Sequence, residues 1–414
     1  MGVTRAPTIL QVIPSLDTGG AELSTLEIAS ALVRVGGRAL VATTGGRLAD
    51  ELVRRGGEIV PFPAASKSPL TLFANIGRLA ELCRREGVAL IHARSRAPAW
   101  SALAAARRLK LPFVTTYHGA YGNKEPFKDV YNSVMARGNL VIANSAYTAR
   151  LIGERHRTPT GRIRVVNRGV DLAVFDPAAV SEARLDALRR DWGLSPDGKV
   201  ILHAARLTGW KGQRVVVAAA AELLRTGHLG DAVIILAGDA QGRTGYADEL
   251  ESAVRAAGLA GRVKLVGHCA DIAAAFRLAH VAVVASTEPE AFGRAATEAQ
   301  AMACPVIATA IGAPAETVLA APGVGVEERT GWLVPPGDAV ALARALVEAM
   351  GLDGGGREAL GMRARRHVAM RYSLEAMQLG TLAVYDELLG SGLAARFKAA
   401  TDLGAHVPPS DPPS

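Results

Sequence analysis

Short apolar runs alternate with amphipathic stretches along nearly the whole chain, and the alternation starts twice. In the first part, residues 8–14 and 38–43 have the apolar character of buried strands, and the stretch over 21–35 between them has helical spacing. The same alternation restarts at residues 199–205 and continues through 305–309. Strand, helix and strand repeated in this way favour parallel sheets with helices on both faces. The sequence therefore predicts the α/β class, with two Rossmann-like, doubly wound domains in tandem.

The same pattern predicts where the domains end. We expect an N-terminal domain over residues 1–178, a short helix in the linker around 180–192, and a second domain over 195–371. A periodic segment over 373–390 follows after the second domain is complete, so it predicts one further helix. The tail over 391–414 is weakly patterned, ends in a Pro-rich sequence and is expected to be disordered.

The positive charge is concentrated in the first part of the chain. The formal net charge is +8, but residues 1–176 hold 24 Lys and Arg against 13 Asp and Glu, whereas residues 177–414 hold 23 against 26. One interpretation is a set of Arg-rich, solvated helix faces. The other is a first domain that faces an anionic partner, such as acidic lipid head groups or a phosphorylated acceptor. Nucleic acid is the least favoured partner, because the basic residues are dispersed and no aromatic residues are interleaved with them.

Several sequence signatures are absent. There is no GxGxxG fingerprint after a strand and no GxxxxGK[ST] loop, which disfavours dehydrogenases and P-loop NTPases, and there is no GxSxG elbow. The Asp-x-Asp metal clip is missing and His and Cys lack metal-ligand spacing, so no bound metal is expected. Three cysteines, no signal-peptide pattern and no apolar run near the ~20 residues of a membrane span favour a cytoplasmic protein.

Two glutamates eight residues apart straddle the junction between a loop and a helix. Glu290 and Glu298 follow the apolar strand 281–285, and a helix from about Phe292 would offer free backbone N–H groups and a positive dipole end. Such an end binds phosphate or electron-rich hydroxyl groups. Glu290 would then accept hydrogen bonds from a sugar ring, and Glu298, about two turns along the helix, would take a ribose diol. By spacing alone, the two could equally be a helix-start carboxylate and a surface residue.

The full string EPEAFGRAATEAQAMACPVIATAIGAPAETV around these glutamates resembles the signature of the retaining glycosyltransferases of family 4, which have the GT-B fold. The Glu–seven–Glu spacing, the Phe-Gly pair, the Pro-Val-Ile-Ala strand and Glu316 stand in order. The resemblance implies two Rossmann-like domains facing across a cleft, the first holding the acceptor and the second the nucleotide. It also implies that Glu290 is catalytic and that the donor is bound by Phe292, Gly293, Arg294 and Glu298.

A pair of basic residues follows the first strand of the second domain. Arg206 and Lys211 stand where members of the family have an Arg and a Lys that hold the donor diphosphate. A diphosphate suits paired cations at the carboxyl end of a strand, because Arg offers a bidentate fork and Lys a compact charge. The local sequence alone would also fit a structural role, in which Arg206 forms a salt bridge and Lys211 starts a helix.

Three positions in the first domain match the family less specifically. Gly19 and Gly20 join the first strand to the first helix, where the family has a loop near the donor phosphates and glycine lets backbone amides approach a ligand. An ordinary glycine turn is the alternative. His118 follows the strand 112–117, at a place where the family often has a His that contacts the donor sugar, so the resemblance implies that His118 is catalytic together with Glu290. A lone His at a strand end is otherwise more often structural.

Two further pairs and one helix are matched by position. Asn144 and Ser145 resemble the family's cleft-lining pair on the acceptor side, although they could equally be a helix cap. Val266 and His268 are expected near the nucleotide base, where backbone and shape rather than a side chain make the contacts. The helix over 373–390 resembles the family's C-terminal helix, which crosses back to pack on the first domain.

Three positions depart from the family pattern. Cys304 and Ala205 stand where the family usually has Gly, and Gly312-Ala313 replaces a double Gly. None of these changes removes a functional side chain. The last could alter the shape of the loop near the diphosphate.

The implied reaction moves a sugar from a UDP- or GDP-sugar to an acceptor hydroxyl, with retention of configuration and with no metal or other cofactor. Arg206, Lys211 and the helix start would stabilise the leaving diphosphate. The positive first domain motivates a lipopolysaccharide-core or other cell-surface glycolipid acceptor, and a peripheral position on the inner face of the membrane. Alternatives are a sugar-nucleotide epimerase of the same architecture and a non-catalytic two-domain protein that binds a small ligand. The basic residues considered for membrane contact are Arg84 and Arg85, or Arg107, Arg108 and Lys110.

Overall fold

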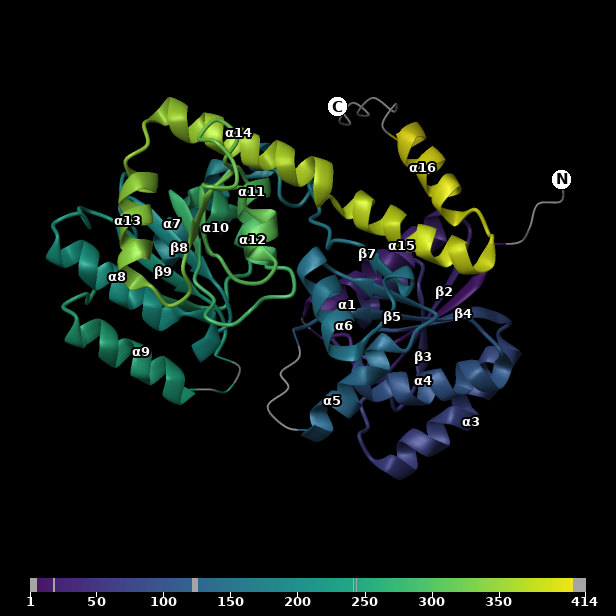
Figure 1. Cartoon of the computed structure of the whole chain (residues 1–414). Helices are drawn as coiled ribbons and strands as arrows, with labels where there is room; N and C mark the ends of the chain where they lie inside the picture. Colours follow the sequence, from purple (N-terminus) through teal and green to yellow (C-terminus); the bar gives the residue numbers. More distant parts are fainter. Residues whose placement is uncertain (1–5, 18, 121–125, 241, 243, 405–414) are drawn as a thin grey trace. The chain divides into compact units, whose positions relative to one another are not determined.

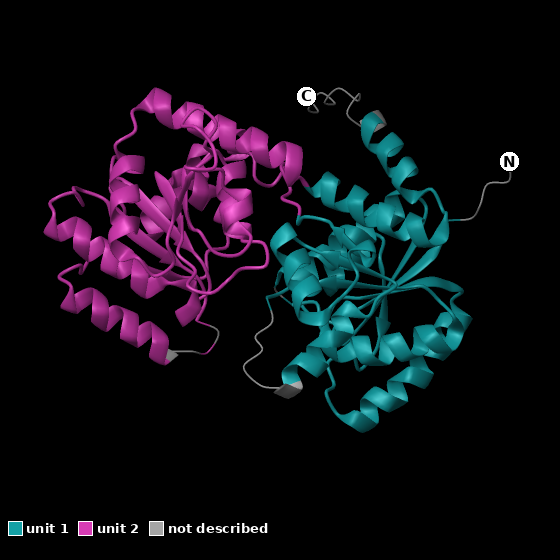
Figure 2. Ribbon diagram, in the orientation of Figure 1, with its two compact units in different colours: residues 1–168, 374–414 teal, residues 169–373 magenta. Residues whose placement is uncertain are grey.

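The chain forms two compact units, and the first of them is discontinuous in sequence. The computed structural model describes residues 6–17, 19–120, 126–240, 242 and 244–404. Unit 1 contains residues 1–168 and 374–414, and unit 2 contains residues 169–373 (Figure 2).

Unit 1 is built on a seven-stranded parallel sheet with the order β3-β2-β1-β4-β5-β6-β7. Figure 1 labels the main helices and strands of both units. The strand order reverses between β1 and β4, so the carboxyl ends of these strands border the crevice where open α/β sheets bind ligands. The strands are β1 Thr8–Val12, β2 Arg38–Thr43, β3 Glu58–Pro61, β4 Val88–Ala93, β5 Phe113–Tyr117, β6 Leu140–Ala143 and β7 Ile163–Val165. The helices are α1 Gly20–Arg34, α2 Ala49–Arg54, α3 Pro69–Arg85, α4 Arg96–Leu109, α5 Pro126–Asn132, α6 Ala146–His156, α15 Leu374–Leu389 and α16 Leu393–Gly404.

Unit 2 repeats this architecture with a six-stranded parallel sheet in the order β10-β9-β8-β11-β12-β13. Here the order reverses between β8 and β11. The strands are β8 Val200–Ala204, β9 Val233–Ala237, β10 Val263–Gly267, β11 Val281–Val284, β12 Val306–Thr309 and β13 Trp332–Val334. The helices are α7 Glu182–Asp191, α8 Gln213–Arg225, α9 Thr244–Ala256, α10 Ile272–Leu278, α11 Arg294–Ala301, α12 Pro314–Thr317, α13 Ala339–Met350 and α14 Gly354–Arg371, and short 3-10 turns lie at Ser133–Ala136, Thr160–Arg162, Pro177–Ala179 and Gly209–Lys211.

The central strands of both sheets are buried on both faces, which is why they read as continuous apolar runs. In β11 and β12 every residue is buried, and in β1 only the first is not. Each unit accordingly has two apolar clusters, one on each side of its sheet. The predicted α/β class, with two Rossmann-like doubly wound parallel sheets, is confirmed.

The boundary between the units lies earlier than the predicted end of the first domain at residue 178. Residues 169–178 belong to unit 2, where the amide of Val170 donates to the carbonyl of Tyr372 at 2.8 Å and Phe175 packs in an apolar cluster. The side chain of Arg365 also donates to the carbonyl of Phe175 at 2.7 Å. Burial of Phe175 in this cluster anchors the segment to unit 2, which is why the first domain ends before residue 178.

The prediction of a disordered tail from residue 391 is wrong over 393–404, which form α16. Leu393 and Phe397, four residues apart on one helix face, are almost completely buried in the unit 1 cluster that also contains α1. The guanidinium of Arg34 on α1 lies 5.7 Å from the centre of the Phe397 ring. Leu393 and Phe397 thus anchor this segment to unit 1. The segment is too short to give a strong periodic pattern in the sequence, which is why its helix was not predicted. Residues 405–414 lie outside the described residues.

The helices of the described residues are short or carry many charged and polar side chains. None of those over residues 6–404, with the gaps given above, is both long and apolar enough to cross a bilayer.

Candidate functional site

The predicted basic residues of unit 2 lie in the loop that leaves the carboxyl end of β8. Arg206 has an exposed side chain, and its carbonyl accepts a hydrogen bond from the Gln213 side chain at 2.9 Å. Gly212 lies in the left-handed region at φ 80°, and a Cβ there would collide with the carbonyl oxygen of Ala285 at the end of β11. The loop is therefore pressed against the neighbouring strand at the switch point of the sheet, where only glycine fits.

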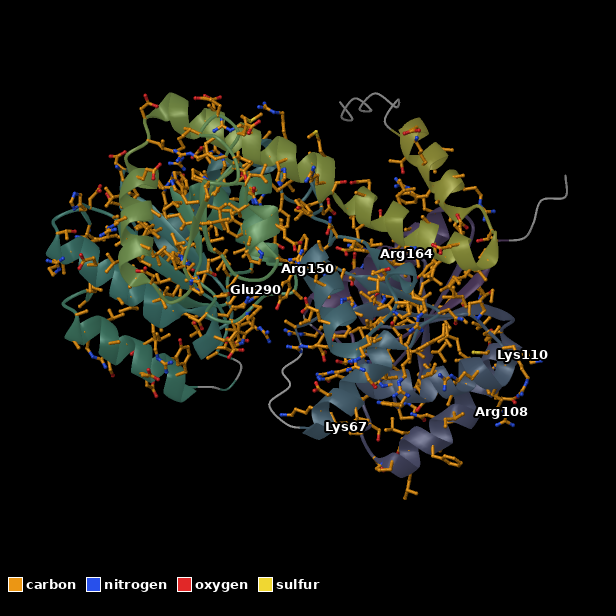
Figure 3. The ribbon with its side chains drawn as sticks, in the orientation of Figure 1. Lys67, Arg108, Lys110, Arg150, Arg164 and Glu290 are labelled. Carbon is orange, nitrogen blue, oxygen red and sulfur yellow. The ribbon has the colours of Figure 1, made fainter. Side chains whose placement is uncertain are left out.

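Lys211 and Glu290 meet at this switch point. The ammonium of Lys211 lies 2.8 Å from Oε1 of Glu290, and their side chains are only 16% and 10% exposed. The hydroxyl of Ser286 donates to the same carboxylate oxygen. The Trp210 ring lies beneath the ammonium, 4.4 Å from its centre. The loops after β8 and β11 thus bring together two residues that the sequence placed in one site but did not pair (Figure 3 labels Glu290).

The backbone of Glu290 is fixed by the loop that follows β12. Glu290 and Gly312 form a parallel β-bridge, and the amide of Ala313 donates to the carbonyl of Glu290 at 2.9 Å. Gly312 has φ 71°, and a Cβ there would lie 2.5 Å from the carbonyl oxygen of Glu290 and 2.7 Å from its nitrogen. Ala313 has ordinary helical angles and is fully buried. Gly312 is thus a glycine at the position whose positive φ requires one. Ala313, which departs from the family pattern, has ordinary helical angles, so this change does not strain the loop.

Helix α11 starts at Arg294, two residues later than predicted. Its N-cap is Gly293 at φ 81°, where a Cβ would lie 2.7 Å from the Pro314 side chain. Because Gly293 has no side chain, the cap residue itself offers no oxygen to the first turn of α11. The side chain of Phe292 lies in an apolar cluster of unit 2. Its ring is 3% exposed and packs edge-on against Tyr372, with 5.8 Å between ring centres. The side chain of Phe292 is therefore part of the core of unit 2.

Glu298 is almost buried and is paired along its own helix. Both Nε and Nη2 of Arg294 bind Oε1 of Glu298, at 3.0 and 2.7 Å. The two predicted donor residues are therefore partners, and Oε2 is the Glu298 oxygen that remains for a diol. The Arg294 guanidinium also orients the carboxylate, because a contact one turn apart fixes the side-chain rotamer.

The predicted base site lies at the carboxyl ends of β9 and β10. Val266 is half-buried and His268 is exposed. The amide of Gly238 donates to the carbonyl of Gly267 at 2.7 Å, and a Cβ at Gly238 would collide with the carbonyl of Ala205. Backbone hydrogen bonds and close backbone contacts thus hold the carboxyl ends of β8, β9 and β10 together. No contact of the described structure assigns a ligand to Val266 or His268.

In unit 1, Gly19 and Gly20 lie where β1 leads into α1. Nη2 of Arg168 donates to the carbonyl of Gly20 and, at 3.3 Å, to the hydroxyl of Ser24. A Cβ at Gly20 would collide with the Arg168 guanidinium, and one at Gly19 with the Glu22 carboxylate. Glycine is therefore needed here to admit side chains of the protein itself. Thr18 in the same loop lies outside the described residues.

His118 stands beside this arginine with one nitrogen still available. Its Nδ1 lies 3.3 Å from Nη2 of Arg168, while its Nε2 is buried and has no hydrogen-bond partner within the described residues. Burial, and then the positive charges of Arg168 and Arg94, hold the pKa of His118 well below its usual value. The ring is therefore neutral at pH 7. Because Nδ1 accepts from Arg168, the proton lies on Nε2, which is placed to donate to a ligand oxygen.

Arg94 and Arg168 are functional candidates that the sequence interpretation missed. Both are buried and line one small cavity of about 20 Å³ together with His118 and Asn144. Nε of Arg94 donates to the side-chain oxygen of Gln11 at 2.8 Å. Burial lowers the pKa of Arg94, because the charged guanidinium is poorly solvated there. Arg94 directly follows an apolar strand, and that position is the signal that could have identified it.

Asn144 and Ser145 prove to have different surroundings. Ser145 caps α6, because its hydroxyl accepts from the amide of Thr148 at 3.0 Å. The Thr148 hydroxyl in turn donates to Oδ1 of Asn144 at 2.9 Å. The cap interpretation therefore describes Ser145, whereas Asn144 also faces the cavity beside His118.

Over the described ranges, no three His, Cys, Asp or Glu side chains come together in a way that could hold a metal ion.

Two family models match the chain in succession. The model of Glycosyltransferase Family 4 matches residues 18–174, and the model of Glycosyl transferases group 1 matches residues 186–367. The two matches follow the division into units, since the first ends and the second begins close to the start of unit 2.

Curated relatives and a solved structure are similar to the chain over most of its length. The D-inositol 3-phosphate glycosyltransferase of Xylanimonas cellulosilytica is 30% identical over 89% of this chain and 92% of the relative. The enzyme of the same name from Kineococcus radiotolerans is 34% identical, over 64% of this chain and 60% of the relative's own length. A glycosyltransferase from Rickettsia africae has the same fold, with a TM-score of 0.84, 32% identity, and coverage of 93% of this chain and 99% of that chain.

Proposed function

Because the chain belongs to glycosyltransferase family 4, we propose that it transfers a sugar from a nucleoside-diphosphate sugar to an acceptor hydroxyl, with retention of configuration and without a metal ion. The observation that carries this proposal is the Lys211–Glu290 pair at the switch point of the second sheet. A cation and a carboxylate held half-buried at that edge match the two ends of the donor, a diphosphate and a sugar ring with hydroxyls.

In this proposal Lys211 stabilises charge on the leaving diphosphate. Negative charge grows on the β-phosphate as the glycosidic bond breaks, and a fixed cation in a poorly solvated site is most effective there. Glu290 and Trp210 hold the ammonium in place before the donor arrives. Arg206 and the open start of α11 supply further positive potential, and Glu298 takes the ribose diol through Oε2.

In the same step Glu290 both holds the Lys211 ammonium and binds hydroxyls of the donor sugar. Its Oε1 is taken by Lys211 and Ser286, so the carboxylate is oriented and can accept sugar hydroxyls through its other oxygen. The leaving phosphate accepts the proton of the acceptor hydroxyl as the new glycosidic bond forms on the same face. His118 contributes Nε2–H as a hydrogen-bond donor to the donor sugar.

The acceptor in this proposal is anionic. Arg94 and Arg168, two buried guanidiniums, create positive potential beside His118 at the carboxyl edge of the first sheet. A phosphorylated polyol is the first candidate, because the curated relatives are D-inositol 3-phosphate glycosyltransferases. A lipid-linked or lipopolysaccharide-core precursor is the second, and one surface feature favours it.

That feature is the first turn of α3. Leu70 and Phe73 are 84% and 78% exposed, and exposed Lys67 precedes them. Large apolar side chains beside a cation form the usual contact of a peripheral protein with an anionic bilayer. Because α3 begins after β3, this turn lies at the carboxyl edge of the sheet, the same edge as His118. The basic residues at the C-terminal ends of α3 and α4 lie at the opposite edge: Arg84, Arg85, Arg107, Arg108 and Lys110. Figure 3 shows Arg108 and Lys110 together and far from Lys67.

The first test is thermal stabilisation by a panel of UDP-, GDP- and ADP-sugars. A ligand at about 100 times its Kd adds roughly 2.7 kcal/mol to the free energy of unfolding. We expect one nucleotide class to stabilise the protein, and Lys211→Ala and Glu298→Ala to abolish the shift. The absence of a shift with any sugar nucleotide would overturn the donor assignment.

The second test is release of the nucleoside diphosphate with defined acceptors. The donor found in the panel is incubated with D-inositol 3-phosphate, with myo-inositol, or with lipopolysaccharide-core glycolipid. Turnover that requires the phosphorylated polyol supports the first acceptor, and turnover that requires the glycolipid supports the second. An altered free sugar nucleotide formed without any acceptor would instead identify an epimerase.

A further inference from the structure

A second cavity lies in unit 2 at the edge of the sheet opposite to the proposed donor site. It has a volume of about 300 Å³ and is bordered by α7, α10, the loop before β8 and the first turn of α14. Figure 1 labels these three helices. Val200, the first residue of β8, and His280, the residue before β11, form its floor. The amide of Val200 donates to Nδ1 of His280 at 3.1 Å, and the amide of His280 donates to the carbonyl of Val200 at 2.8 Å. The five residues of β8, at ~3.3 Å each, separate this cavity from the donor loop.

Three arginines from three elements line this cavity. Arg189 comes from α7, Arg277 from α10 and Arg357 from α14. The single acidic residue in the lining is Glu182, whose side chain is 79% exposed and lies 3.5 Å from Arg189. Burial lowers the pKa of His280 to about 4, so this ring is neutral at pH 7. The lining therefore has an excess of positive charge at its mouth and walls.

The described residues do not supply hydrogen bonds and ion pairs for all the N–H groups of these three arginines. Nε of Arg189 is buried and has no hydrogen-bond partner within the described residues, although its Nη1 binds Asp186 at 2.7 Å. Arg357 donates to the carbonyl of Ala279 at 2.8 Å, and no described carboxylate is paired with it or with Arg277. Burial and then the charge of Arg277 lower the pKa of Arg357 and raise the cost of keeping it charged. An anion in the cavity would pair with all three groups and offset that cost.

The lining also has an apolar part, beside the polar Ser195. Leu185, Leu194 and Leu278 cover one part of the wall, together with the ring of Pro196. A volume of about 300 Å³ is at the lower end of the range for small-molecule sites. A bare inorganic anion would leave most of this space unfilled.

We propose that this cavity is a binding site for a small phosphate monoester, with the phosphate between Arg189, Arg277 and Arg357 and the organic part against the leucines. The site is separate from the donor site and does not depend on Lys211 or Glu290. The proposal therefore stands or falls independently of the glycosyltransferase assignment.

The test is calorimetric titration of the full chain with glucose 6-phosphate as the probe, with glucose and inorganic phosphate as comparisons. We expect glucose 6-phosphate to bind at one site, to bind more tightly than inorganic phosphate, and to bind equally well to Lys211→Ala. Glucose should produce no heat. No binding of glucose 6-phosphate, or binding lost in Lys211→Ala, would overturn the proposal.

Variants identify the cavity itself. Arg277 is exposed, so Arg277→Glu leaves packing intact and should weaken binding by at least about tenfold, while Arg277→Lys should retain most of it. Arg189→Gln should also weaken binding. Arg366→Glu is the matched control, because Arg366 is exposed on α14 nine residues after Arg357, on the opposite side of the helix at 100° per residue. Equal affinity in Arg277→Glu and the wild type would exclude this cavity as the site.

Discussion

The hydroxyl of Tyr385 lies 2.6 Å from Nδ1 of His92, across 293 positions of sequence. Tyr385 is on α15, His92 is on β4, and both side chains are completely buried. The other ring nitrogen of His92 lies 2.7 Å from the hydroxyl of Thr116 on β5. This chain of three side chains ties the C-terminal helix to the centre of the first sheet, and both nitrogens of the imidazole are used.

Tyr385→Phe should therefore destabilise the protein by about 1–3 kcal/mol, because the change leaves a buried imidazole nitrogen without a partner. The measurement is urea unfolding followed by circular dichroism. Tyr147→Phe, in a half-buried tyrosine of the same unit, is the control and should change the free energy of unfolding by much less. Equal stability of Tyr385→Phe and wild type would show that this hydrogen bond contributes nothing to the docking of α15.

Buried histidines should make the fold sensitive to acid well above the range in which carboxylates titrate. Burial lowers the pKa of His203 to about 4, and holds that of His92 well below 6.5. Unfolded histidine titrates near 6.5, so between about pH 6.5 and 4 the unfolded chain binds more protons than the folded one. Stability is therefore highest above pH 6.5 and falls as the pH drops, by up to about 1.4 kcal/mol per unit for His203.

The measurement for this effect is the urea midpoint between pH 7.5 and 5. His203→Asn should flatten the slope, whereas replacement of the exposed His228 should leave it unchanged. A midpoint that is constant over this range would contradict the assignment of neutral, buried histidines in the folded state.

Lys211→Ala should remove catalysis and leave the fold intact. The change removes the cation proposed to stabilise the leaving diphosphate, so kcat should fall by about 100- to 1000-fold, as for other lost transition-state contacts. Lys199→Ala, at the other edge of the same sheet, is the control for loss of a lysine. The initial rate of nucleoside diphosphate release is measured with each variant. A loss confined to KM would show that Lys211 serves ground-state binding alone.

Gly312→Ala should disturb Glu290 specifically. Gly312 and Gly337 both have φ near 70–80°, but a Cβ at Gly337 meets nothing within 4 Å, whereas one at Gly312 meets the backbone of Glu290. Both variants should lose about 1–2 kcal/mol of stability from backbone strain. Only Gly312→Ala should lose activity as well. Equal activity of the two variants would show that the position of the Glu290 backbone is unimportant.

Membrane association, if it follows the proposed orientation, should depend on the start of α3. Leu70→Ser with Phe73→Ser should abolish sedimentation with phosphatidylglycerol vesicles, because this turn supplies the exposed apolar contact. Neutralising Arg107, Arg108 and Lys110 should have a smaller effect, because these residues lie at the opposite edge, beyond the ~10 Å range of screened charges. Val53→Ser serves as a control for an exposed apolar residue on α2. A reversed order of effects would place the membrane-facing surface at the ends of α3 and α4.

The sequence predicted the architecture well because parallel strands buried on both faces leave a continuous apolar signature, as in β11 and β12. The resemblance to the family placed Lys211 and Glu290 in the donor site, and the structure brings them together because both follow neighbouring parallel strands, β8 and β11. It missed Arg94 and Arg168, since an arginine in a sequence reads as surface unless burial is known. It assigned Phe292 to the donor and gave no packing role to Phe397, because apolar side chains near a loop or a tail have no periodic pattern to reveal what covers them.

The discontinuity of unit 1 has a consequence for the order in which the chain folds during its synthesis. Residues 374–404, which supply Tyr385 and Phe397 to the core of unit 1, are made only after all of unit 2. Unit 2 is continuous, so it can fold while still attached to the ribosome, whereas unit 1, which is begun first, is completed only after residues 374–404 have been made. Until then, the apolar face of α1 that receives α15 and α16 is uncovered, which makes the nascent chain a client for chaperones at its N-terminal half rather than at its centre.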